Sequence, residues 1–103
     1  MEKRTNSEEL KKRTKTFALR IIKFAEALPR TRAIDVMVKQ LLRSATSVAA
    51  NYRVSCRARS QADFISKIGI TEEESDETLL WLELLYESGL VKDPANEGLI
   101  LIL

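Results

Sequence analysis

Apolar residues recur at intervals of three and four along most of the chain, the repeat of helices that pack on one face. The clearest case is the stretch 34–57. At about 100° per residue, one arc of its helical wheel carries Ile34, Val38, Leu41, Ala45, Val48, Ala49, Tyr52 and Cys56. Beside it runs a strip of small or amide side chains, namely Gln40, Ser44, Ser47, Asn51 and Ser55. The pattern predicts a helix with a core face and a second face suited to close helix contact.

Local signals set the ends of three predicted helices. A side chain that can cap the backbone stands before each repeat, and the candidates are Thr5 or Asn6, Thr31 and Ser60. Pro29 ends the first repeat, and the short connection that follows it favours an antiparallel neighbour. We therefore expect helices at about 7–28, 32–58 and 61–88.

The third predicted helix has two apolar stripes. Its inner face is expected to carry Phe64, Ile68, Thr71, Ser75, Leu79, Leu82 and Tyr86. The second stripe consists of Ile70, Leu80, Trp81 and Leu84. Because a monomeric bundle needs one inner stripe, the second predicts a subunit contact, and Ser47 and Asn51 are further candidates for that interface. Alternatively, the segment after the third helix covers this stripe.

That last segment opens with helix signals. Gly89 suits the residue just past a helix end, and Asp93-Pro94 suits the start of another helix. The residues to Leu103 are too few to match helices of more than twenty residues. The expected fold is all-α, an antiparallel up-down four-helix bundle with a short or truncated fourth helix, forming a single domain over residues 1–103.

Composition agrees with a helical domain. The 103 residues are 45% hydrophobic and include only three glycines and two prolines, so helix breakers are scarce. There is no apolar run of 18 residues and no apolar block of the signal-peptide type near the start, so we expect a cytoplasmic protein without a membrane span. The single cysteine, Cys56, lies on the core arc, which favours a role as a small hydrophobic side chain over a reactive thiol.

Charge is divided unevenly along the chain. Residues 1–59 hold 15 Lys and Arg against five Asp and Glu, a net charge of +10, whereas residues 60–103 hold two against ten, a net charge of −8. The first half could meet an anionic partner, or the two halves could neutralise each other by packing side by side. Both interpretations stay open at this point.

A basic ridge on the second predicted helix is the strongest functional candidate. Arg32, Lys39, Arg43, Arg53 and Arg57 fall within about 80° of one another on the wheel. The first predicted helix adds an outer face with Lys11, Lys12, Arg13, Lys15, Arg20 and Lys23. Arginines along a helix can meet successive phosphates of RNA or DNA, and the expected contacts are Lys39, Arg43, Arg53, Arg57, Lys12 and Arg20. For each arginine, an ion pair with the third helix or a second subunit is the alternative.

The chain lacks the residues of common catalytic and metal sites. It has no histidine and one cysteine, which excludes zinc sites, Ser-His and Cys-His nucleophiles and the Glu-x-x-His pairs of di-metal bundles. The acids between Glu72 and Glu77 point around the whole helix, which favours a solvated face over a cation site. We expect a protein that is not an enzyme and that uses no cofactor or metal.

A stretch of the second and third predicted helices resembles a known family. The matching residues are Gln40-Leu41-Leu42-Arg43-Ser44-Ala45, Ser47-Val48, Asn51, Asp63-Phe64, Ile68 and the Leu-rich run from Leu79, with Phe24 and Leu28-Pro29 at the end of the first helix. They resemble the four-helix-bundle proteins of intervening sequences in bacterial large-subunit ribosomal RNA genes, over about residues 14–92. After Asn51 the family commonly has Ile-Ala-Glu-Gly, where this chain has Tyr52-Arg53-Val54-Ser55.

The resemblance implies a bundle that assembles with itself as a ring, typically a homopentamer, and no settled biochemical activity. A similar bundle is the accessory protein of diversity-generating retroelements, which engages nucleic acid and a reverse transcriptase. With the charge pattern, this predicts a non-catalytic oligomer that binds nucleic acid or a nucleic-acid enzyme through helices one and two. The alternative is a homo-oligomeric interaction scaffold that binds no nucleic acid.

Overall fold

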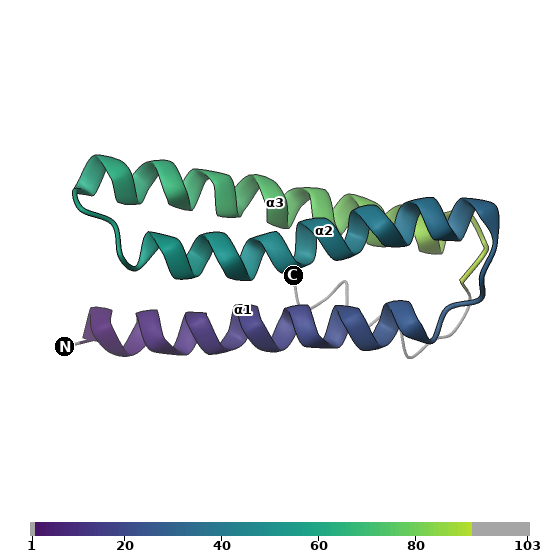
Figure 1. The fold of residues 1–103 in the computed structure, drawn as a ribbon, viewed down its shortest axis with the longest axis horizontal. Helices are drawn as coiled ribbons and strands as arrows, with labels where there is room; N and C mark the ends of the chain where they lie inside the picture. The colour runs from purple at the N-terminus through teal and green to yellow at the C-terminus, as the bar shows by residue number, and fades with distance from the viewer. Residues whose placement is uncertain (1, 92–103) are drawn as a thin grey trace.

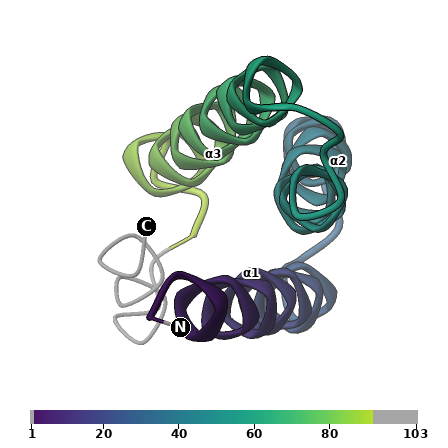
Figure 2. The same cartoon turned by 90° about the vertical axis from the view of Figure 1, so that its left-hand side faces the viewer.

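The structure is a computed structural model, and it describes the backbone of residues 2–91 and the side chains of residues 7–91. Within this range the chain forms three helices, α1 (Glu2–Glu26), α2 (Arg32–Ser55) and α3 (Gln61–Glu87), and no strand. The helices run up, down and up, joined by short turns (Figure 1). α2 lies between the other two and packs against both (Figure 2). The all-α prediction is confirmed, whereas the predicted fourth helix falls outside the described residues.

The second and third helices begin where their capping residues predicted. The Ile34 N–H donates to Thr31 Oγ1 at 3.1 Å, and the Asp63 N–H donates to Ser60 Oγ at 3.0 Å. Each hydroxyl satisfies a backbone donor that the first helical turn leaves without an intrahelical acceptor. Gly89 adopts a φ of 78° just past α3, the left-handed conformation that glycine allows at a helix end.

The predicted ends of the other segments need correction. α1 starts at Glu2, so Thr5 and Asn6 lie within the helix and are not its cap, because nothing in this polar stretch breaks a helix. It ends at Glu26 instead of residue 28, since the residue before a proline disfavours helical geometry. α2 ends at Ser55 instead of residue 58, and α3 ends one residue earlier than predicted.

The hydrophobic core is concentrated at one end of the molecule, near the α1–α2 turn and the last turns of α3. Its buried members are Phe17, Ile21, Phe24, Leu28, Ile34, Leu41, Ala45, Leu82, Leu85 and Val91. The predicted core arc of α2 is confirmed, since each of its members is buried or half-buried. The inner face predicted for α3 is only partly right: Leu82 is buried, but Phe64 is 41% exposed, because the first half of α3 buries no residue.

Candidate functional site

A cationic groove runs between the first half of α1 and the last turns of α2. The cavity has a volume of about 380 Å³ and is lined by Glu8, Lys11, Lys12, Lys15, Arg53 and Arg57. We call these six residues the cationic groove. An adjoining hollow of about 450 Å³ shares Lys11, Lys15 and Arg53 and adds a floor of Ala49, Ala50 and Val54. Five positive side chains therefore border one surface.

Helix periodicity and chain direction bring these cations together. Lys11 and Lys15 are four residues apart on α1, and Arg53 and Arg57 are four apart on α2, so each pair lies on one side of its helix. The two helices run antiparallel, which places the start of α1 beside the end of α2 (Figure 1). The two pairs of cations consequently face the same groove from its two sides.

One acid lies among the described lining residues of the groove. Glu8 Oε1 is 3.0 Å from Lys11 Nζ, and the Glu8 side chain is 70% exposed. An exposed pair of this kind contributes about 0–1 kcal/mol, so an external anion can replace the carboxylate at little cost. The groove keeps an excess of four positive charges after this pair is counted.

Tyr52 fixes the inner wall beside the groove. Its side chain, predicted on the core arc, is only 8% exposed. Burial raises the pKa of the Tyr52 phenol, and a hydrogen bond with Ser7 of α1 acts in the opposite direction. This contact ties the first turns of α1 to the end of α2 and so supports the alignment of the two cation pairs.

The predicted basic ridge is divided among different surroundings. Lys12, Arg53 and Arg57 line the cationic groove. Arg20 lies on another side of α1, in a hollow shared with Lys12, Arg13, Thr16 and Phe17. Lys39 borders a third hollow near the α1–α2 turn, which also holds Arg30 and Asp35. The sequence analysis did not select Lys11 and Lys15 as contacts, although their four-residue spacing opposite Arg53 and Arg57 was a usable signal.

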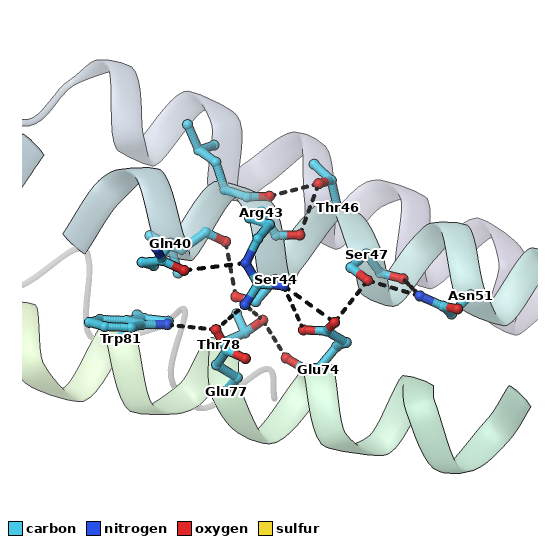
Figure 3. Close-up of polar contacts among 12 residues, drawn as sticks. Gln40, Arg43, Ser44, Thr46, Ser47, Asn51, Glu74, Glu77, Thr78 and Trp81 are labelled. Atoms are coloured by element: carbon cyan, nitrogen blue, oxygen red, sulfur yellow. Dashed lines mark hydrogen bonds and ion pairs between the residues drawn. The ribbon is translucent and has the colours of Figure 1, made fainter. Parts of the chain in front are cut away.

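Arg43, by contrast, is engaged within the molecule. Its guanidinium forms ion pairs with Glu77 and, at 3.3 Å, with Glu74 of α3 (Figure 3). Its Nε donates to Gln40 Oε1 at 3.3 Å. The alternative considered for each arginine, an ion pair with the third helix, therefore applies to Arg43.

The small-polar strip of α2 forms the rest of this junction with α3. Ser44 and Thr78 are fully buried, and the Thr78 hydroxyl lies 2.9 Å from Ser44 Oγ. Ser47 Oγ donates to Glu74 Oε2 at 3.2 Å, and Asn51 Nδ2 donates to Ser47 Oγ at 2.8 Å (Figure 3). The strip thus makes the close helix contact that its composition predicted.

The residues predicted for a subunit interface have two different environments. Ser47 and Asn51 belong to the junction just described, and Trp81 packs partly against the core while its Nε1 donates to Glu77 Oε2 at 3.1 Å. Ile70, Leu80 and Leu84 are exposed by 37%, 46% and 40%. Only these three present an apolar surface without intramolecular cover from the described part of the chain.

Comparison with known proteins identifies the family. The family model described as 23S rRNA-intervening sequence protein matches residues 7–101. The chain belongs to this family. A similar solved structure is that of a protein of unknown function from the S23 ribosomal protein family of Bacteroides thetaiotaomicron, with 36% sequence identity and a TM-score of 0.83. The match covers 93% of this chain and 86% of that one. No curated protein matches the chain significantly in sequence.

Two further findings bear on the site. Within residues 2–91, no helix is long and apolar enough to cross a membrane. The described side chains also contain no group of three or more Cys, Asp or Glu residues arranged to hold a metal ion. In this part of the chain, the strongest concentration of charge is therefore the cationic groove.

Proposed function

We propose that this protein binds nucleic acid through the phosphate backbone, without catalysis, and that the cationic groove is the contact surface. The supporting observation is the gathering of five cations from two helices around one exposed groove that contains a single acid among its described lining. Lys and Arg side chains that neutralise phosphates release condensed counterions, which gives affinity that is independent of sequence and strongly dependent on salt. Lys39 and Arg20 lie outside the groove and are secondary contacts in this proposal.

The test measures the salt dependence of binding to a labelled duplex of about 20 base pairs. Replacing two groove cations, as in Lys15→Ala with Arg53→Ala, removes two phosphate contacts. The slope of the logarithm of affinity against the logarithm of salt concentration should fall by about 1.8, since each contact contributes about 0.9. Fluorescence anisotropy at several salt concentrations gives this slope.

The matched control removes the same charge elsewhere on α2. Arg32 and Lys39 are exposed and lie outside the cationic groove, so Arg32→Ala with Lys39→Ala should leave most of the slope in place. Equal losses in both double variants would assign binding to net charge and contradict the proposed surface. Failure of the parent protein to bind at low salt would contradict nucleic-acid binding itself.

A variant with gained affinity provides a second test. Glu8→Gln removes the carboxylate that competes for Lys11, so affinity for the duplex should rise and the salt slope should steepen by up to about one. Loss of affinity in this variant would show that Glu8 orders the groove instead of competing with phosphate. Helical content measured by circular dichroism checks that α1 is intact.

A second candidate function follows from the apolar stripe on α3. Exposed Ile70, Leu80 and Leu84 favour a homo-oligomeric scaffold, in which charged residues serve packing between subunits. Arg43 already serves packing within the subunit. The double variant Arg43→Glu with Arg53→Glu separates the two candidates, because it should dissociate a charge-held assembly but should leave assembly intact and abolish binding at an anion site.

A further inference from the structure

Aromatic rings are kept away from the cationic groove. The chain has six aromatic residues, and all lie in the described part. Phe17, Phe24 and Tyr52 are buried, with exposures of 7%, 6% and 8%. Tyr86, Trp81 and Phe64 belong to α3, which contributes no residue to the groove. None of the six rings is therefore available for stacking on a nucleic-acid base there.

The floor of the groove also lacks groups that read bases. Ala49, Ala50 and Val54 form it, and the last two are exposed. Their side chains carry neither hydrogen-bond donors nor acceptors, and the backbone amides of a helix interior are used within the helix. The groove can therefore offer a nucleic acid cationic contacts and a small apolar surface that permits close approach.

The cations are spread over a surface and do not follow one line. On each helix they lie about 6 Å apart along the axis, and packed helix axes are about 8–10 Å apart. A single strand presents one line of phosphates, whereas a duplex presents two strands and one charge per about 1.7 Å of its length. The arrangement suits the broader and denser charge of the duplex.

Single strands also lose the contacts that usually compensate for their lower charge. Stacking on an aromatic side chain is worth between about five-fold and about 150-fold in affinity per base. The counterion contribution per contact is smaller for a single strand, with a slope of about 0.7 against about 0.9 for a duplex. Resting on the proposed function, we propose that the cationic groove is specific for double-stranded nucleic acid, RNA or DNA, over single strands.

The test compares a duplex of about 20 base pairs with each of its separated strands by anisotropy at one low salt concentration. The duplex should bind at least about five-fold more tightly than either strand. A single strand that binds as tightly as the duplex would overturn this inference and leave the proposed function standing. Binding of neither probe would overturn the proposed function and this inference together.

An added ring tests the physical reason. Ala50 is exposed on the floor of the hollow, so Ala50→Trp places an aromatic surface where a base can stack. The ratio of duplex to single-strand affinity should fall about five-fold or more, whereas Ala50→Leu, which adds apolar bulk without a ring, should preserve the ratio. An unchanged ratio in Ala50→Trp, with helical content retained, would overturn the account that missing aromatic contacts exclude single strands.

Discussion

At the scale of single residues, Arg43 and Arg53 show how neighbouring positions on one wheel acquire different roles. Both belong to the predicted basic ridge, but Arg43 contacts acids of α3 and Arg53 lines the cationic groove beside α1. Because α2 packs between two helices, side chains at opposite edges of an 80° arc, an angle that follows from about 100° per residue, meet different neighbours. Sequence periodicity predicted the arc, and tertiary packing divided it.

Glu77 allows a prediction of pH dependence at this junction. Hydrogen bonds from Arg43 and from Trp81 Nε1 hold the pKa of Glu77 below its ordinary value of 4.5. The stabilisation is therefore complete above the unfolded-state pKa and is lost as the pH falls through the lower folded-state pKa. Glu77→Gln should lower the melting temperature near neutral pH and flatten its decrease in acid.

Thermal unfolding between about pH 7 and pH 3 checks this expectation. The control is Glu73→Gln, which removes the same charge at an exposed position of α3 away from the printed contacts of the junction. If Glu77→Gln and the parent protein lose stability in parallel as the pH falls, the junction does not depend on the Glu77 carboxylate.

At the scale of helices, the caps were predictable and the lengths less so. Thr31, Ser60 and Gly89 act through bonds and angles within a few residues, so their types determine their roles. The start of α1 was wrong because a capping sequence only permits a helix to begin, and the helix formers before it also permit continuation. Helix boundaries depend on this balance of small local terms.

Two glycines provide a matched test on and after α3. Gly69 lies inside the helix, and an added Cβ would meet no atom within 4 Å, so Gly69→Ala should stabilise the protein by roughly 0.5–1 kcal/mol. Gly89 has a φ of 78°, so Gly89→Ala should destabilise it by about 1–2 kcal/mol. Urea unfolding measures both values, and effects of the same sign in both variants would contradict this assignment of the two backbones.

At the scale of the whole molecule, the described core and the cationic groove occupy opposite ends. The core gathers around the α1–α2 turn and the end of α3, whereas the groove lies at the start of α1 and the end of α2. This separation lets the groove residues remain exposed without weakening the main apolar cluster. Variants of the groove cations are therefore expected to fold, which makes the binding experiments interpretable.

The exposed stripe of α3 gives a prediction about assembly. If it is a subunit contact, Leu80→Lys with Leu84→Lys should reduce the mass measured by light scattering to that of one chain, 11.7 kDa. Leu19→Lys with Ile65→Lys changes two exposed apolar residues outside this stripe and should leave the mass unchanged. A parent protein that is already monomeric across a salt series would contradict the scaffold and the predicted interface.

The sequence by itself determined the helical class, the caps of α2 and α3 and the core arc of α2, because helix periodicity and capping are local properties. It also indicated that the small-polar strip would suit close packing. Only the tertiary structure decided which cations share a groove, which arginine is held by α3 and which apolar residues stay exposed. These outcomes depend on which helix lies beside each face, and residues far apart in the chain set that arrangement.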